Sequence, residues 1–228
     1  MRHAMRALPG ALLLLILSCE PSAAPPGPLL LPSARAVNIP PGAPAFAVQR
    51  VYDGDTLTLA NGRKVRLLAV DTPELRGQDG RPEEGSREAR DFVRNLCEGR
   101  EAWLEFDVER EDSYGRWLCY VYVRTPQGDR MVNAELLRAG LARYYTPGPV
   151  NLRHAEFLLA CQREAREAGR GTWKDYVLAR DKAVVVTRTG RAYHRRDCET
   201  LRTSRELRTV RLEEALDRGL SPCRTCRP

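Results

Sequence analysis

The stretch FAVQRVYDGDTLTLANGRKVRLLAVDTP, residues 46–73, decides the predicted fold of this 228-residue chain. Polar and apolar residues alternate over Thr56–Leu59, which is the period of a half-buried strand. Asn61-Gly62 is a strong signal for a two-residue hairpin turn. The run Lys64–Val70 then reads as a third strand, which ends before Pro73 because proline cannot continue the hydrogen-bonded ladder.

The residues that follow predict further strands and helices in a compact domain. We expect strands over 102–106 and 117–123, and helices over 86–96, 132–139 and 152–168. Five short strands, arranged as a meander and a pair, suit a small closed barrel of the OB type. The predicted fold class is therefore α+β: a five-stranded OB-type barrel with three helices over residues 46–176, followed by a small C-terminal module over residues 183–228.

Several classes of enzyme are disfavoured by the residues that the chain lacks. Its histidines are His3, His154 and His194, which makes a Ser-His-Asp hydrolase improbable. Neither the GxxxxGK[ST] phosphate loop nor the GxGxxG dinucleotide motif occurs. Any catalysis must therefore rely on carboxylates, arginines and metal ions.

Three separated motifs in order resemble the staphylococcal nuclease (thermonuclease) family. They are DGDT at 53–56, RLLAVDTPE at 66–74 and DSYGR at 112–116. The resemblance spans residues 46–173 and includes MVNAELLRAGLA at 131–142 and GTW at 171–173. It implies an OB-type barrel with three helices and a Ca²⁺-dependent phosphodiesterase activity.

The resemblance also implies roles for individual residues. Asp55 and Asp71 are similar to the calcium-binding carboxylates, with the main-chain carbonyl of Thr72 as a third ligand. Arg66 and Arg116 are similar to the arginines that bind the phosphate, and Glu74 is similar to the general base. Tyr114 and Tyr145 are similar to the two tyrosines that contact the nucleotide. Tyr144 is the alternative for the second tyrosine because the match is gapped there. Ser113 replaces a lysine common in the family.

These residue types also suit the chemistry of phosphodiester hydrolysis. Ca²⁺ is a hard cation that takes oxygen ligands, which two aspartates and a carbonyl supply. Arginines and a divalent cation oppose the negative charge that develops on the phosphate. A carboxylate near the ion can accept the proton of the attacking water.

Two functions follow as hypotheses. The first is an exported nuclease that hydrolyses DNA and RNA with low sequence specificity, acting as a monomer. The second is a noncatalytic nucleic-acid-binding lipoprotein of the cell envelope.

The C-terminal module carries a metal-binding pattern. His194-x3-Cys198 and Cys223-x2-Cys226 are separated by 24 residues, and one histidine with three cysteines suits a closed, structural zinc site. A disulfide is the alternative, because an exported protein meets an oxidising environment. We predict no disulfide bond for the three cysteines of the preceding domain, Cys97, Cys119 and Cys161. Residues 183–228 also carry +5 of the formal net charge of +7, which suits weak affinity for DNA; a stability cap or a protein-docking surface is the alternative.

The first 45 residues predict export. Residues 1–19 combine arginines, a short apolar run and Ser18-Cys19, which is typical of a signal peptide. Acylation of Cys19 would anchor the protein in the cell envelope, and this lipid would be its only contact with the membrane. A cut after Ala23 or Ala24 is the alternative and would give a secreted protein. Residues 20–45 hold 8 of the 16 prolines and read as a linker.

Overall fold

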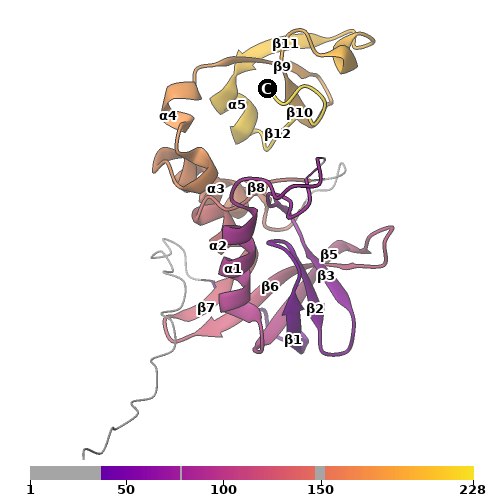
Figure 1. Ribbon diagram of the computed structural model, residues 1–228, viewed down its shortest axis with the longest axis vertical. Coiled ribbons are helices and arrows are strands. Elements are labelled where there is room, and N and C mark those ends of the chain that lie inside the picture. The colour runs from indigo at the N-terminus through magenta and orange to yellow at the C-terminus, as the bar shows by residue number, and fades with distance from the viewer. Residues whose placement is uncertain (1–36, 78, 147–151) are drawn as a thin grey trace, which may run out of the picture.

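The computed structural model describes residues 37–77, 79–146 and 152–228. The predicted signal peptide, Cys19 and most of the predicted linker lie outside these residues. Figure 1 shows the barrel at one end of the molecule, helices beside and beyond it, and the C-terminal module at the other end. Within the described ranges, no helix combines the length and the apolar character that crossing a bilayer requires.

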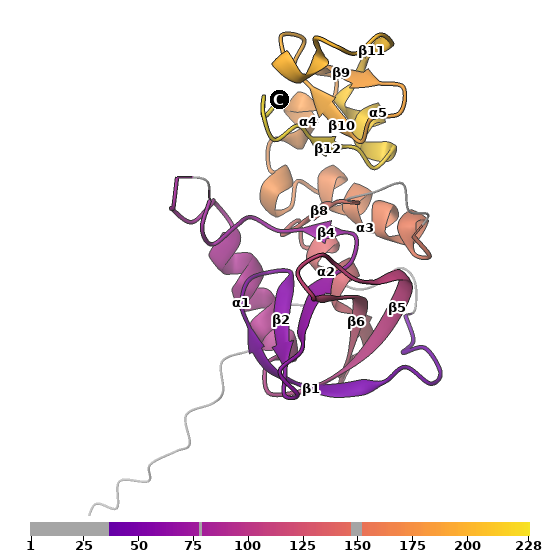
Figure 2. The same cartoon turned by 90° about the vertical axis from the view of Figure 1, so that its right-hand side faces the viewer.

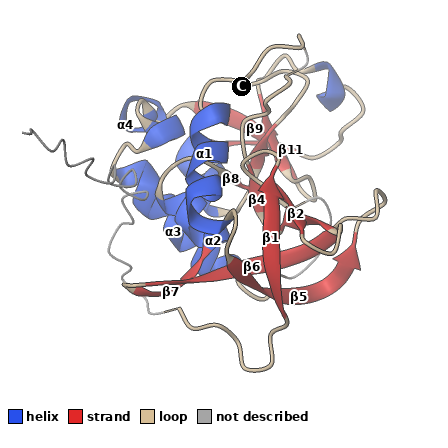
Figure 3. Ribbon diagram, turned by 60° about the horizontal axis from the view of Figure 1, so that its bottom comes forward, coloured by secondary structure: helices blue, strands red, loops and turns tan. Residues whose placement is uncertain are grey.

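The barrel consists of five strands, as the sequence predicts. They are β1 (Ala45–Val51), β2 (Thr56–Leu59), β3 (Lys64–Leu67), β5 (Glu101–Glu111) and β6 (Trp117–Thr125). The strand order is β3-β2-β1-β5-β6, and a parallel pairing of β3 with β6 closes the circle. Figure 3 shows these strands curling around one another with helices on one side. The α+β class and the predicted barrel are confirmed.

The predicted hairpin forms at Asn61-Gly62, but its turn is longer than the expected two residues, because Gly62 N–H donates to the Leu59 carbonyl at 2.9 Å and Leu59 N–H donates to the Arg63 carbonyl at 2.8 Å. Strands β2 and β3 pair antiparallel, with Thr58 opposite Lys64. Gly62 has φ of 81°, a left-handed conformation that glycine adopts without steric cost.

The third strand is shorter than the predicted run Lys64–Val70. It stops at Leu67, and Ala69 takes a left-handed φ of 61°. Such a conformation costs a non-glycine residue about 1–3 kcal/mol, so its surroundings must impose it. The amide of Asn133 does so in part, because its Nδ2 donates to the Leu68 carbonyl at 2.8 Å. The turn redirects the chain into β4 (Val70–Asp71), which leaves the barrel and pairs with β8 (Arg143–Tyr144).

Three helices accompany the barrel, as predicted, with small differences in their ends. They are α1 (Ser86–Cys97), α2 (Val132–Arg138) and α3 (Ala155–Glu167). The hairpin strand β7 (Gly128–Met131) was not predicted, and β5 extends well beyond the expected 102–106. The added part of β5 is largely exposed and polar, so it lacks the apolar alternation that identifies a strand.

A single large apolar cluster fills the barrel and extends under the three helices. Leu57, Leu59 and Leu67 from the strands and Leu136 and Leu137 from α2 are almost completely buried in it. Each buried leucine contributes about 1.5–3 kcal/mol. This core fixes the strand ends on which the polar motifs lie.

The C-terminal module is a small sheet with one helix. Its strands are β9 (Ala183–Thr187), β10 (Ala192–His194), β11 (Leu207–Arg211) and β12 (Ser221–Pro222), in the order β11-β9-β10-β12. Its helix is α5 (Leu212–Asp217), and a short 3-10 turn, η2 (Glu199–Leu201), precedes β11. The strand β11 ends at Arg211, and α5 follows it directly.

The module packs against the rest of the chain. Between α3 and the module lie the 3-10 turn η1 (Gly171–Trp173) and the helix α4 (Tyr176–Ala179). Trp173 and Tyr176 share an apolar cluster with Val184, Tyr193 and Leu216 of the module. In Figure 2 the module lies on the side of α3 and β8 that faces away from the barrel.

Two further contacts fix this placement. Arg166 of α3 is buried and pairs with Asp217 of α5. Gly219 has no room for a side chain, because a Cβ there would come within 2.9 Å of the Tyr144 ring. The module is therefore seated on α3 and β8, which places one of its edges near the end of β4.

Candidate active site

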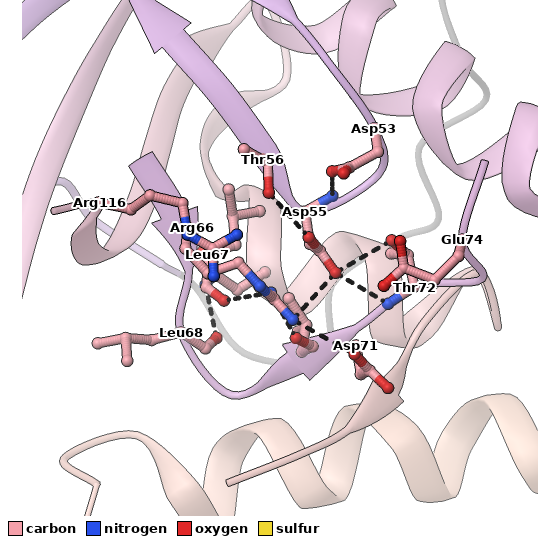
Figure 4. Close-up of polar contacts among 12 residues, drawn as sticks. Asp53, Asp55, Thr56, Arg66, Leu67, Leu68, Asp71, Thr72, Glu74 and Arg116 are labelled. Atoms are coloured by element: carbon pink, nitrogen blue, oxygen red, sulfur yellow. Dashed lines mark hydrogen bonds and ion pairs between the residues drawn. The ribbon is translucent and has the colours of Figure 1, made fainter. Parts of the chain in front are cut away.

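Asp55 and Asp71 lie close together, as the sequence predicts. Asp55 directly precedes β2, and Asp71 is the last residue of β4. Nη2 of Arg66 bridges them, at 3.1 Å from Oδ2 of Asp55 and 3.3 Å from Oδ1 of Asp71 (Figure 4). The turn at Ala69 makes this meeting possible, because it directs the chain after β3 back toward the start of β2.

The Arg66 guanidinium is held from its other side by the main chain. Its Nη1 donates to the carbonyls of Leu67 at 3.0 Å and Val70 at 2.8 Å. These are the residues on either side of the turn at Ala69. The side chain is 15% exposed, so it is anchored while part of it remains open to a ligand.

Thr72 ties the residue after β4 to Asp55. Its backbone N–H and its hydroxyl both donate to Oδ2 of Asp55 at 3.1 Å. Thr72 and Asp55 are both buried. The expected calcium ligands, two carboxylates and the Thr72 main chain, are therefore neighbours.

Asp53 lies beside these residues, although the sequence assigned it no role beyond its place in the motif DGDT. Its Oδ1 accepts a hydrogen bond from the backbone N–H of Asp55 at 3.1 Å. Burial and the nearby charge of Asp55 raise the pKa of Asp53 to about 6. The sequence does indicate Asp53, because the motif DGD at 53–55 places two carboxylates on one tight turn.

Glu74 completes the acidic group from the loop that follows β4. Its side chain is exposed in part. Its main chain is fixed by two hydrogen bonds with Glu83: the Glu74 N–H donates to Oε2 of Glu83 at 3.0 Å, and the Glu83 N–H donates to the Glu74 carbonyl at 2.9 Å. Burial raises the pKa of the Glu74 carboxyl, and the charges of Asp55 and Asp71 raise it further. Glu74 therefore lies within electrostatic range of both aspartates.

Arg116 reaches the site through the closure of the barrel. It directly precedes β6, whose first residue, Trp117, lies opposite Val65 in the parallel pairing with β3. Arg116 is therefore next to the strand that carries Arg66, and Figure 4 shows both side chains in one view. Asp112 orients it, because Nε of Arg116 donates to Oδ2 of Asp112 at 2.8 Å. Burial acts to raise the pKa of Asp112, but hydrogen bonds from Arg116 and the backbone lower it.

The two expected substrate tyrosines are accessible. Tyr114 is 83% exposed, with the Arg116 guanidinium 5.4 Å from its ring centre. Tyr145 is half-buried and lines the cleft beside Asp71 and Glu74. Tyr144 is buried against Gly219, so of the two adjacent tyrosines Tyr145 is the one that a substrate can reach.

The acidic group fits a hard divalent cation. Asp53, Asp55, Asp71 and Glu74 bring four carboxyl groups to one place, and burial raises the pKa of Asp71 as well. Concentrated carboxylates with no sulfur or imidazole among them are the ligand set that Ca²⁺ prefers. A cation at this position would relieve their mutual repulsion.

A second group of possible metal ligands lies in the C-terminal module, and the structure brings together the four residues that the spacing predicts. His194, Cys198, Cys223 and Cys226 offer ligand atoms that all lie within 4.8 Å of one another. The Sγ atoms of Cys198 and Cys223 are 3.9 Å apart, and these cysteines are free rather than bridged. A tetrahedral ion with Zn–S bonds of about 2.3 Å separates its sulfurs by about 3.8 Å. The cluster can therefore hold a metal ion.

The chain is similar to known nucleases. A profile of staphylococcal nuclease homologues matches residues 64–175. The thermonuclease of Staphylococcus intermedius is 33% identical over 135 residues, which cover 57% of this chain and 76% of that protein. The thermonuclease of Staphylococcus hyicus is 32% identical with the same coverage. The endonuclease YncB of Bacillus subtilis is 33% identical over 130 residues, covering 55% of this chain and 60% of YncB. The C-terminal module lies beyond the profile match.

Proposed function

This chain belongs to the staphylococcal nuclease family and is a nuclease, and from that premise we propose that it is an exported, Ca²⁺-dependent endonuclease. Its substrates are DNA and RNA, which it cleaves with little sequence preference. The observation that carries this proposal is the convergence of two aspartates on one arginine nitrogen, with Glu74 in electrostatic range of both.

The two arginines bind the phosphate in this proposal. The guanidinium groups of Arg66 and Arg116 match the oxygens of a phosphodiester in shape and charge. Hydrogen bonds to the main chain and to Asp112 hold them in place before substrate arrives. Charges fixed in this way stabilise the developing negative charge without reorganisation.

Glu74 acts as the general base. Its carboxylate accepts a proton from the water that attacks phosphorus. The hydrogen bonds with Glu83 fix the main chain of Glu74, so its side chain starts from a defined position.

Asp55, Asp71 and the Thr72 carbonyl are the residues that would hold Ca²⁺. When bound, the ion supplies positive charge that polarises the phosphoryl group and neutralises the carboxylates. Asp53 orients Asp55 by accepting the hydrogen bond from its main chain.

Purified protein incubated with denatured DNA, with and without Ca²⁺, tests the proposal. We expect fragments of many lengths, and end-group analysis should give 3′-phosphate and 5′-hydroxyl ends, as the family resemblance implies. Binding without cleavage under every condition would instead support the noncatalytic nucleic-acid-binding lipoprotein.

Replacing Arg116 with alanine is expected to lower kcat/KM on single-stranded DNA by roughly 10²–10³. This is the usual scale for one lost donor to a transition state. Arg110→Ala is the matched control, because Arg110 is exposed and packs on Phe106, with its guanidinium 4.1 Å from that ring. Equal rates for the Arg116 and Arg110 variants would remove Arg116 from the site.

The cluster in the C-terminal module binds structural zinc in this proposal. Burial acts to raise the pKa of the Cys223 thiol, but backbone hydrogen bonds from Cys226 and Thr225 outweigh it and lower the pKa to about 7. Cys223 is thus prepared to act as a thiolate ligand.

Cys226→Ser is expected to abolish zinc binding and to lower the melting temperature of the full chain. In small zinc-binding peptides the metal contributes about 10–16 kcal/mol, so the loss should be visible. Elemental analysis and thermal unfolding measure the two effects. Cys161→Ala is the control, because Cys161 is buried in the main core outside the cluster. Undiminished zinc in the Cys226 variant would refute the ligand assignment.

Export remains part of the proposal. Cys19 is acylated and tethers a monomeric enzyme to the cell envelope, and cleavage after Ala23 or Ala24 would release it instead. The mass of the mature N-terminal peptide distinguishes the two.

A further inference from the structure

A cleft of about 860 Å³ separates the candidate active site from the C-terminal module. Asp71 and Glu74 lie on one wall. The opposite wall carries three arginines of the module, namely Arg191, Arg224 and Arg227. The cleft is thus acidic where a cation is expected and basic across from it.

Arg224 comes close to the candidate site. Its guanidinium lies 5.5 Å from the ring centre of Tyr145. The Tyr145 N–H in turn bonds to the Ala69 carbonyl at 3.2 Å, just before β4. Burial is the main cause of the raised pKa of Asp71, and the charge of Arg224 acts in the opposite direction, so the two groups interact electrostatically.

The main chain around Arg224 is fixed. The N–H of Cys223 donates to the Tyr193 carbonyl at 2.9 Å, and the N–H of Arg227 donates to the Cys223 carbonyl at 2.9 Å. Arg224 also lies between two residues of the metal-binding cluster, Cys223 and Cys226.

Arg191 is fixed by a contact across the cleft. Its Nη1 donates to the Thr146 hydroxyl at 2.8 Å. Ser221, which also lines the cleft, makes a second contact, because its hydroxyl donates to the Tyr144 carbonyl at 3.4 Å. The basic wall is therefore held at a constant position relative to the acidic one.

The charges of this wall are available to an anion. Among the described residues, no carboxylate lies within ion-pair distance of Arg191, Arg224 or Arg227, whereas Arg188 pairs with Glu206 at 2.8 Å. All three cleft arginines are exposed. Exposed guanidinium groups that have no carboxylate partner are suited to binding phosphates.

We propose that the C-terminal module forms the second wall of the nuclease cleft, and that Arg224 and Arg191 bind backbone phosphates of the nucleic acid next to the ester that is cleaved. The inference deepens the proposed function and rests on it. The module then contributes substrate affinity, while the barrel contributes the chemistry.

Binding of a labelled single-stranded DNA to the full chain tests this proposal. The chain carries Glu74→Gln to suppress cleavage, and fluorescence anisotropy gives Kd. Arg224→Gln is expected to raise Kd roughly tenfold, the scale of one charged hydrogen bond. The slope of log Kd against log salt should fall by about 0.7, as for one lost phosphate contact on a single strand. Arg191→Gln should act in the same direction.

Arg208→Gln is the matched control. Arg208 is exposed and lies on β11, at the opposite edge of the sheet β11-β9-β10-β12 from the strands that line the cleft. The Arg208→Gln substitution removes one positive charge from the same module, as Arg224→Gln does. Equal Kd values for the Arg224 and Arg208 variants would overturn the proposal, because the module would then act only through its net charge.

Kinetics in the chain with Glu74 intact supply the second measurement. Arg224→Gln should raise KM on long single strands and leave kcat nearly unchanged, and a dinucleotide with one phosphate should show no difference. A fall in kcat with unchanged KM would also overturn the proposal. A wild-type chain that cleaves nothing would instead refute the proposed function, and the binding comparison would still be valid.

Discussion

Removal of Ca²⁺ with EGTA is expected to abolish cleavage by this protein, and added Ca²⁺ is expected to restore it. Asp55, Asp71 and Glu74 repel one another, and burial of Asp71 increases the cost of its charge. Without a cation these carboxylates also repel the phosphate of the substrate. The rate of release of acid-soluble fragments from denatured DNA, measured against free Ca²⁺, checks this expectation.

Chelation needs a control because EGTA also binds zinc. Restoration by Ca²⁺ alone, with the zinc content of the protein measured before and after treatment, separates the acidic site from the cysteine cluster. Asp71→Asn should raise the Ca²⁺ concentration for half-maximal activity while the zinc content stays the same. Ca²⁺ should also raise the melting temperature of the wild type more than that of this variant, since a ligand stabilises the state that binds it. Full activity in EGTA would rule out the calcium site.

Glu74→Gln is expected to lower kcat by roughly 10²–10⁴, the range typical of a lost general base. Glutamine keeps the size of the side chain but cannot accept the proton of the attacking water at neutral pH. Glu74 is exposed and its backbone bonds to Glu83 do not involve its own carboxyl group, so folding should be preserved. Single-turnover rates on single-stranded DNA, with the melting temperature as a check on folding, give the effect.

Glu83→Gln is the matched control for this variant. It removes one negative charge from the same loop, and an amide oxygen can still accept the hydrogen bond from the Glu74 N–H. Most of the activity should remain. If the Glu74 variant cleaves as fast as the Glu83 variant, the base lies elsewhere.

The two tyrosines at 144 and 145 show where sequence reasoning reached its limit. Both are aromatic, and the gapped match could not separate them. The choice follows from a contact 75 residues away in the chain: Gly219 of the module approaches Tyr144 and buries it, which leaves Tyr145 facing the cleft.

The sequence by itself determined the barrel, its hairpin at Asn61-Gly62, the three helices, the metal-binding spacing of the module and the residue types of the acidic site. The strands, the hairpin, the helices and the ligand spacing follow from local periodicity and turn chemistry, which act over a few residues, whereas the closed barrel and the acidic site were implied by the resemblance to a known family. Only the tertiary structure decided the break at Ala69, the choice between Tyr144 and Tyr145 and the approach of Arg224 to Tyr145. A left-handed alanine has no local signature because distant packing and the Asn133 hydrogen bond impose it. The position of Arg224 depends likewise on how one folded unit packs on another, which no pattern within either unit records.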